Sequence, residues 1–344
     1  MKNYAGLDVS LEETAIAIMD ETGRIVREAK VASEIEAIDR WLGKTGLELA
    51  RVGLEAGPLS SWLYAGLKER GWAMICIETR RLRAVTRAMP VKSDRKDAVA
   101  IAQVMRTGWY RQVHVKSLAS QQLRVLLRHR KILQAKRQDI ENELRGTLKA
   151  FGLKLGTVGR AKFAQRVSEL VAGEPWLERL ALPMLVARAA LLKSFNELHA
   201  LMLKIVKADA DCRRFMTIPA IGAVNALAYK TGVDDPTRFR HSADLGPHFG
   251  LTPRRYESGE TEVVGSISKC GDAMVRGLLF EAAMTLLHRV KATSALKRWA
   301  RSLAKRIGTR KAAVALARKL AVIMHRMWLD GTDFDPKLVR ADTH

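Results

Sequence analysis

Residues 4–9 read Tyr-Ala-Gly-Leu-Asp-Val, a short apolar run with a single acidic side chain, Asp8, near its end. A run of this length and composition is typical of a buried β-strand. Two more strands are expected over residues 14–19 and 24–31, separated by the turn sequence Asp-Glu-Thr-Gly at residues 20–23. The chain therefore begins with a predicted three-strand meander.

The next segments alternate between helix and strand. Residues 34–42 and 60–70 have helical spacing, whereas residues 51–55 and 72–77 are short apolar runs typical of strands. The order β-β-β-α-β-α-β predicts a mixed α/β sheet and matches the RNase H-like arrangement. The actin-like ATPase and sugar-kinase fold begins in the same way, but it needs a second glycine-rich phosphate loop and an adenosine loop downstream. The sequence contains neither.

Four acidic residues fall at strand ends and at a helix start. Asp8 ends the first strand, Glu55 ends the fourth, and Asp94 and Asp97 open a predicted helix that runs to about Met105. Taken singly, each is typical of a turn or cap residue. Strand ends converge at one sheet edge, so the four carboxylates are expected to meet and to need cations. Oxygen ligands suit Mg²⁺ or Mn²⁺, and two such ions can hold a scissile phosphate.

The charge of the chain points to a polyanionic partner. Its 344 residues include 59 Lys and Arg against 36 Asp and Glu, a formal net charge of +23, which makes nucleic acid the first candidate. The three cysteines are far apart, which favours neither a disulfide framework nor a zinc site. No apolar signal core or membrane-length stretch is present, so we expect no membrane partner and a cytoplasmic, nucleoid-associated protein.

The middle of the chain predicts a long helical linker. Residues 117–153 lack proline and read as one helix, and a second helix is expected after Pro183. The segment between them, residues 152–183, is expected to be irregular. A heptad row in the second helix favours a coiled coil, either as an antiparallel hairpin or as a dimerising element, although a plain helical bundle core fits the periodicity equally well. The row is Met184, Leu191, Leu198 and Ile205.

The C-terminal third carries two motifs that suit phosphate binding. Residues 218–222, Ile-Pro-Ala-Ile-Gly, resemble the hairpin of helix-hairpin-helix modules, although an ordinary proline and glycine turn reads the same way. Residues 250–259, Gly-Leu-Thr-Pro-Arg-Arg-Tyr-Glu-Ser-Gly, predict a loop. Its serine, Ser258, is of a type common in turns, but nearby cations could neutralise a phosphodiester there. These cations are Arg254, Arg255, Lys269 and Arg276.

The tail predicts a further nucleic-acid-binding surface. Residues 291–319 read as a basic amphipathic helix in which Arg301, Lys305 and Arg306 are prominent. The apolar positions of this helix are mostly small alanines, which favours phosphate-backbone binding over insertion into a membrane surface.

Together these motifs resemble the DEDD transposases of the IS110/IS1111 insertion-sequence type, a family that includes the pilin-gene DNA invertases. The resemblance rests on Asp8, Glu55, Asp94 and Asp97, on the Ile-Pro-x-Ile-Gly turn, and on residues 250–259 followed by Ser-Lys-x-Gly-Asp at 268–272. It extends over nearly the whole chain, with both halves in the family's order. Departures are Ala220 in the turn and Pro247-His248 before the Phe-Gly-Leu-Thr-Pro run.

The resemblance implies three regions and a mechanism. It implies a RuvC-like DEDD catalytic domain over residues 1–115, a coiled-coil linker over 116–210, and a mostly helical transposase domain over 211–335. It further implies that Ser258 attacks DNA and forms a phosphoserine intermediate, assisted by Mg²⁺ or Mn²⁺ on the four carboxylates. The implied partners are donor and target DNA, a noncoding bridge RNA, and further copies of the chain in a homodimer or homotetramer.

Two other functions fit the same residues. A metal-dependent junction-resolving nuclease would use the carboxylates to activate water and would leave Ser258 idle; a protein-linked DNA product separates it from the recombinase. A non-enzymatic RNA-binding or chromosome-organising scaffold would use the basic surfaces alone, and metal-dependent strand cleavage would exclude it.

Overall fold

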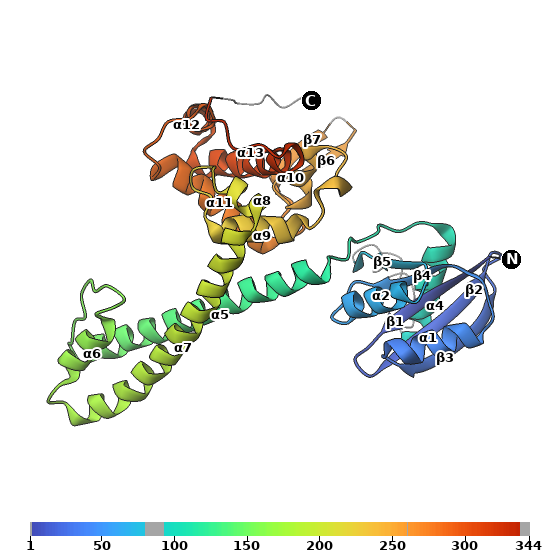
Figure 1. The fold of residues 1–344 in the computed structure, drawn as a ribbon, viewed down its shortest axis with the longest axis horizontal. Coiled ribbons are helices and arrows are strands. Elements are labelled where there is room, and N and C mark those ends of the chain that lie inside the picture. Colours follow the sequence, from blue (N-terminus) through green and yellow to red (C-terminus); the bar gives the residue numbers. More distant parts are fainter. Residues whose placement is uncertain (1, 80–92, 260, 338–344) are drawn as a thin grey trace. The chain divides into compact units, whose positions relative to one another are not determined.

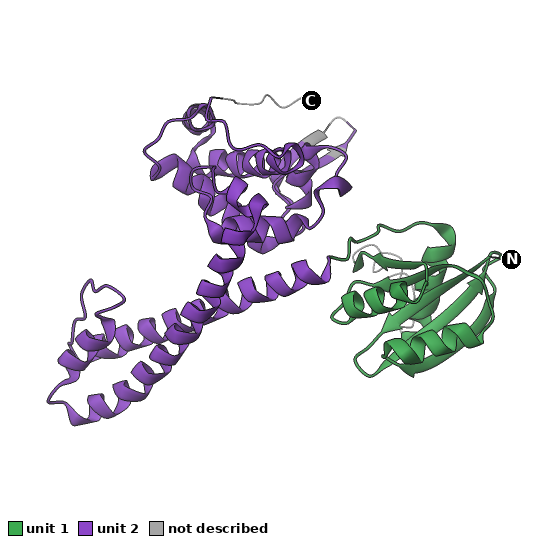
Figure 2. Ribbon diagram, in the orientation of Figure 1, with its two compact units in different colours: residues 1–116 green, residues 117–344 purple. Residues whose placement is uncertain are grey.

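The structure is a computed structural model that describes residues 2–79, 93–259 and 261–337. It divides into two units, residues 1–116 and residues 117–344 (Figure 2). Among the described residues, no helix has both the length and the apolar character needed to cross a membrane.

Unit 1 is built on a five-stranded sheet with the order β3-β2-β1-β4-β5. The first three strands form an antiparallel meander, and β4 and β5 join β1 in parallel. This confirms the mixed α/β sheet and every strand that the sequence predicts in this region. The strands are β1 (Asn3–Val9), β2 (Glu13–Asp20), β3 (Ile25–Ala32), β4 (Leu49–Glu55) and β5 (Met74–Ile77).

Helices cover both faces of this sheet. Helix α1 (Ile35–Lys44) connects β3 to β4, and α2 (Ser60–Glu69) connects β4 to β5. Both bury one face of the sheet, where alternate residues of β1 such as Leu7 join their apolar side chains. Helix α4 (Asp94–Thr107) packs on the opposite face, against small residues of β1 and β2 (Figure 1). The period-two alternation of a strand thus divides β1 between two different cores.

Unit 2 begins with a helical hairpin. Helix α5 (Leu118–Ala150) leads to the short α6 (Phe163–Val171), and α7 (Pro175–Ala208) returns alongside α5 (Figure 1). The expectation of an irregular segment up to Pro183 is wrong, because α7 begins eight residues earlier at Pro175. Proline suits the first helical turn, and Pro183 is exposed, so water can serve the carbonyl that loses its helical partner.

A buried ion triad crosses the hairpin. Glu141 of α5 accepts hydrogen bonds from Arg137 at 3.1 Å and from Arg188 of α7 at 2.8 Å. Arg188 also donates to the carbonyl of Arg160 and lies over the ring of Phe163. Because one partner left alone would be an uncompensated buried charge, the triad favours a single register of α7 on α5. Arg137 is therefore part of the hairpin interior.

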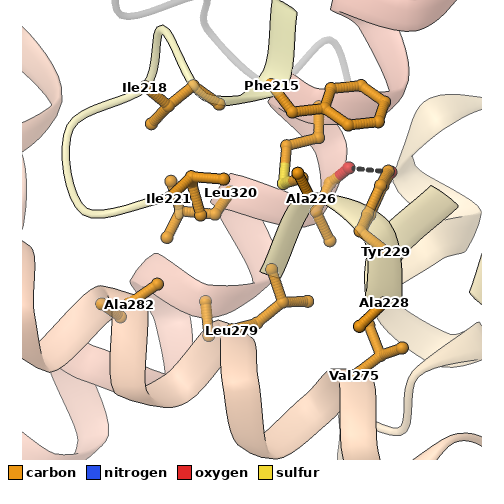
Figure 3. Packing of buried hydrophobic residues seen from close by; sticks show 14 of the residues in the cluster. Phe215, Ile218, Ile221, Ala226, Ala228, Tyr229, Val275, Leu279, Ala282 and Leu320 are labelled. Atoms are coloured by element: carbon orange, nitrogen blue, oxygen red, sulfur yellow. Dashed lines mark hydrogen bonds between the residues drawn. The ribbon is translucent and has the colours of Figure 1, made fainter. Parts of the chain in front are cut away.

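The rest of unit 2 is a helical bundle that confirms the mostly helical C-terminal region. Its central residues come from α8, α9, α11 and α13, and the Tyr229 hydroxyl donates to the Ala321 carbonyl at 2.7 Å across the core (Figure 3). The elements are α8 (Ala210–Phe215), α9 (Ala223–Val233), η1 (Pro236–Arg238), η2 (Ser242–Asp244), α10 (Leu245–His248), β6 (Pro253–Ser258), β7 (Thr261–Ile267), α11 (Ala273–His288), α12 (Ala295–Ile307) and α13 (Thr309–Asp330).

Two local expectations for this region are wrong. The predicted loop around Ser258 is the antiparallel hairpin β6–β7. The sequence Thr-Glu-Val-Val-Gly-Ser-Ile at 261–267 carries the β-branched residues that favour a strand, and Ser-Gly suits the turn before it. The single basic tail helix is two helices, α12 and α13, because Gly308 between them has a φ of 84° that continues neither.

The Ile-Pro-Ala-Ile-Gly turn joins α8 to α9 and is anchored by its isoleucines. Ile218 and Ile221 are buried in the bundle core, as Figure 3 shows. Between them Ala220 has a φ of 77°, in the left-handed region that glycine adopts without cost. The backbone of this turn thus has the geometry expected of a glycine at a position where the chain carries alanine.

We expect Ala220→Gly to raise the free energy of unfolding of unit 2 by about 0.5–1 kcal/mol. Left-handed backbone costs an alanine roughly 1–2 kcal/mol, and the greater freedom of glycine in the unfolded chain offsets part of the gain. The urea midpoint of the full chain measures the change. The control is Ala200→Gly at an exposed position inside α7, which should lower stability by about 1 kcal/mol. A loss of stability in Ala220→Gly would contradict the strain argument.

Candidate active site

Asp8 and Glu55 lie side by side at the end of two parallel strands. β1 and β4 pair with Leu7 opposite Leu54. Asp8 follows Leu7 and Glu55 follows Leu54, so this register brings Asp8 opposite Glu55. Residues in register project on the same face, with strands roughly 5 Å apart. Both side chains are partly exposed. The fold thus places two carboxylates together at the carboxyl edge of the sheet.

The same edge brings the start of α4 toward this pair. Asp8 is opposite Ala15 on β2, and Ala15 is opposite Lys30 on β3, which forms one row across three strands. Lys30 makes an ion pair with Asp94 at 3.7 Å. At its other end α4 is held by Arg51, which donates to the Met105 carbonyl at 2.6 Å. Helix α4 therefore begins over the row that contains Asp8 and runs back across the sheet.

Two glycines determine how closely α4 approaches. A β-carbon on Gly6 would lie 2.2 Å from the carbonyl oxygen of Ala98 and 2.4 Å from the amide nitrogen of Ala102. A β-carbon on Gly53, the register partner of Gly6, would lie 2.6 Å from the side chain of Met105. Each glycine precedes an acidic residue by two positions and therefore shares its face of the sheet.

Asp94 and Asp97 extend the sheet-facing stripe of α4 by one turn. They precede the buried Ala98 and Ile101 by four residues each, which places them on the same side of the helix. Ser93 caps the helix, and the Asp97 amide donates to the Ser93 carbonyl at 2.9 Å. Within residues 2–79, 93–259 and 261–337, no three His, Cys, Asp or Glu side chains lie close enough together to hold a metal ion.

Ser258 is the last residue of β6, at the outer end of the β6–β7 hairpin. It pairs with Thr261 of β7 and is exposed. The base of the hairpin is tightly closed, because Gly250 lets the carbonyl of Cys270 approach to 2.2 Å of where a β-carbon would be. His248, the nearest histidine in the sequence, packs against Phe239 and Phe249 at this base.

The four cations predicted near Ser258 are not gathered around it. Arg254 donates to the Ser268 carbonyl at 3.2 Å, and Arg276 donates to the carbonyls of Phe249 and Cys270, all at the base of the hairpin. Lys269 is also at the base, with a φ of 55°. Only Arg255 lies farther along the strand, three residues or roughly 10 Å from Ser258.

The predicted tail cations form an exposed group on α12. Arg301, Lys305 and Arg306 are all exposed, whereas the opposite side of α12 is buried through Leu296 and Ala300. The amphipathic pattern that the sequence predicts is thus present in α12.

The cysteines have no place in this chemistry. All three are free, and Cys76 and Cys212 are buried. Burial raises the pKa of Cys76 to about 11 and the pKa of Cys212 to about 12, so both stay protonated thiols at neutral pH.

Sequence comparisons match two parts of the chain to transposase families. Residues 5–152 match a DEDD-type transposase family model of the IS110 group, described as "Transposase", and residues 212–300 match the "Transposase IS116/IS110/IS902 family". A "Probable family 20 transposase" of Pseudomonas aeruginosa is 31% identical over 253 residues, which cover 71% of this chain and 74% of that protein. The chain belongs to the IS110/IS1111 family of transposases.

Two further relatives support this assignment. The transposase for insertion sequence element IS1111A of Coxiella burnetii is 29% identical over 328 residues, covering 93% of this transposase and 87% of the relative. The transposase for IS1328 of Yersinia enterocolitica is 29% identical over 245 residues, covering 71% and 73%. The chain is therefore a DNA-processing enzyme, and DNA is a partner.

Sequence reasoning overlooked Gly6 and Gly53 in this transposase. The signal was present, since Gly-Leu-Asp at 6–8 and Gly-Leu-Glu at 53–55 repeat one pattern. A glycine inside a strand often marks a close backbone approach. What the pattern cannot name is the element that approaches, because α4 is more than 40 residues from either glycine in the sequence.

We expect Gly6→Ala to lower the stability of unit 1 by about 3 kcal/mol and to abolish transposition. The added carbon meets backbone atoms of α4, which must move away from the sheet and take Asp94 and Asp97 with it. Gly53→Ala should be milder, because it meets only the flexible Met105 side chain. Gly43→Ala in α1, where nothing lies within 4 Å, is the matched control; it should leave transposition unchanged and should not lower stability, because alanine has the higher helix propensity. Thermal unfolding and a plasmid transposition assay measure both effects, and a neutral Gly6→Ala would refute the close contact.

Proposed function

We propose that this transposase cuts and rejoins DNA through a phosphoserine intermediate on Ser258, assisted by a divalent metal bound through Asp8, Glu55, Asp94 and Asp97. The observation that carries the proposal is the placement of Asp8 beside Glu55 on the face of the sheet where α4 begins. The register of β1 on β4 and the ion pair of Asp94 with Lys30 support a common edge for acidic residues of three segments, where turn and cap roles would not require them together.

The donor set suits a hard divalent cation. Carboxylate oxygens are the ligands that Mg²⁺ and Mn²⁺ prefer, and the partly exposed side chains of Asp8 and Glu55 leave room for water and a phosphate oxygen. When bound, the metal would neutralise charge that develops on the phosphate. Lys30 stands next to this edge and holds Asp94, so binding of the metal by Asp94 requires exchange of one exposed ion pair, which costs little.

Ser258 is the proposed nucleophile. Its Oγ forms a bond to phosphorus while the bond from phosphorus to a deoxyribose oxygen breaks. The serine proton passes to water, and the leaving oxygen takes a proton from water to become a free hydroxyl. A hydroxyl of another DNA end can then reverse the step and release Ser258. The bond energy is retained in the serine ester, so rejoining needs no external energy source. The exposed position of Ser258 at the end of a hairpin leaves its Oγ open to a polymer as large as DNA.

The remaining parts are assigned roles in the same scheme. We assign the carboxylate chemistry to residues 1–115, the linking role to the helical hairpin of residues 116–210, and the serine chemistry to residues 211–335. The exposed apolar side chains Leu182 and Val186, one turn apart on α7, support assembly as a coiled-coil dimer or tetramer. The net charge of +23 supports binding of polyanions and retention at the nucleoid, whereas a bridge RNA as guide besides the two DNA partners is proposed on the family resemblance alone.

We expect Asp97→Asn to abolish recombination and leave the fold intact. The substitution keeps the shape of the side chain and the backbone hydrogen bond to Ser93, but it removes a charged metal ligand. Recombination of a plasmid substrate in Mg²⁺ measures activity, and the thermal midpoint measures folding. Glu69→Gln, an exposed position at the end of α2, is the matched control and should remain active. Full recombination by Asp97→Asn would rule out the metal site.

We expect wild-type protein to form covalent adducts with labelled DNA that survive denaturing electrophoresis, and Ser258→Ala and Asp8→Asn to form none. The first variant lacks the nucleophile, and the second lacks a ligand for the metal that assists it. Ser194→Ala, at an exposed serine on α7, should form adducts normally. Adducts that persist in Ser258→Ala would exclude this serine. Cut DNA without adducts in the wild type would favour the junction-resolving nuclease.

A further inference from the structure

Unit 2 contains a large groove lined by both basic and apolar residues. It has a volume of about 1750 Å³ and lies between α13, the segment 240–244 and the inner part of the β6–β7 hairpin. Six of its lining residues are Arg or Lys and three are Asp. The cations are Arg240, Arg310, Lys311, Arg318, Lys319 and Arg326, and the acids are Asp244, Asp333 and Asp335.

The cations form a row along one side of α13. Lys311, Arg318 and Arg326 are successively about two helical turns apart, which puts neighbours roughly 11 Å apart on one face. All three are exposed, and none of them makes an ion pair with a described residue. A row of unneutralised cations on a rigid helix suits a polyanion that follows the helix for several turns.

Arg318 and Lys319 are packed differently in the lining of the groove. A β-carbon on Gly246 would lie 2.9 Å from Arg318 Nε, so the arginine stem lies flat on α10 where glycine leaves room. Lys319 stacks over the Trp299 ring at 5.0 Å and is buried. Apolar residues such as Val314 and Ile323 complete the lining. Arg318 thus covers its carbon stem and remains exposed, whereas the Lys319 ammonium lies over the indole ring.

The groove is continuous with the hairpin that carries Ser258. Its lining includes Val264 to Ile267 of β7 and Pro253 of β6. We infer that this groove binds the phosphate backbone of DNA next to the phosphodiester that Ser258 attacks. The inference rests on the proposed role of Ser258, because the hairpin leads from the groove to that residue. DNA is favoured over RNA since the strand held there must be the one that the serine cuts.

The groove also supplies what the hairpin end lacks. Three of the four cations expected to neutralise the scissile phosphate are at the base of the hairpin, and Arg254 and Arg276 hold backbone carbonyls there. Cations spaced along α13 bind flanking phosphates instead, which positions the DNA without reading its sequence. Binding energy from these remote contacts would align one phosphodiester with an exposed serine.

The test uses the triple variant Lys311→Gln, Arg318→Gln, Arg326→Gln in a Ser258→Ala background, so that no cutting occurs. The probe is a short duplex DNA of arbitrary sequence, titrated at several salt concentrations. Loss of three phosphate contacts should lower the slope of log K against log salt by about 3 and the affinity at least tenfold at roughly 0.1 M salt. The charge-retaining triple Lys311→Arg, Arg318→Lys, Arg326→Lys should bind like its parent.

A matched control removes three charges elsewhere in the same unit. Lys149, Lys154 and Lys162 are exposed near α6, and their replacement by Gln should leave DNA affinity within about threefold of the parent. Unchanged DNA affinity in the groove variant, or an equal loss in the control, would overturn the inference. So would a loss confined to duplex RNA of the same sequence.

The outcome is separable from that of the proposed function. If the wild type forms covalent adducts and the groove variant binds DNA normally, Ser258 remains the proposed nucleophile and the groove is excluded as a DNA-binding site. If the groove variant loses DNA affinity but the wild type forms no adducts, the groove binds DNA but is not linked to a reaction at Ser258. That result would overturn the inference as stated.

Discussion

The close contact between α4 and strand β1 is the constraint on which unit 1 depends. The helix backbone lies where a β-carbon on Gly6 would be, so the helix cannot shift or rotate without losing contact with the sheet. That contact positions the first turn of α4 over the row that contains Asp8, with Lys30 and Arg51 holding its two ends. The apolar core on the other face of the sheet could form without this contact. The acidic residues of the three segments would then not be held at the same edge of the sheet.

In unit 2, polar contacts select one arrangement of the helices among several that apolar packing alone would allow. Heptad-like helices can slide past each other by a turn at little cost, whereas the Glu141 triad has one register in which all three charges are satisfied. Asp272 does the same at the start of α11. It caps the helix by accepting from the amides of Met274 and Val275, and it pairs with Arg124 of α5. The Ser-Lys-x-Gly-Asp motif thus fastens the bundle to the hairpin.

The excess of cations therefore divides into two populations. Arg124, Arg137, Arg188 and Arg276 are bound by carboxylates or backbone carbonyls inside unit 2 and are part of its architecture. The cations of α12 and of the α13 row are exposed and available to a polyanion. Net charge does not distinguish the two, because a guanidinium has the same formal charge in both places. Only the second population is expected to contribute to salt-dependent DNA binding.

The sequence by itself determined the strands and helices of unit 1, the type of sheet, the family, and which acidic residues end strands or open a helix. These follow from periodicity and local composition, which act over a few residues. The tertiary structure decided that Gly6 and Gly53 are contact points for α4, that Arg276 holds the base of a hairpin far from Ser258, and that α7 continues through Pro183. It also brought Lys311, Arg318 and Arg326 into a groove shared with β7. Each of these depends on segments that are distant in the chain, and no local pattern specifies which distant segment will supply the partner.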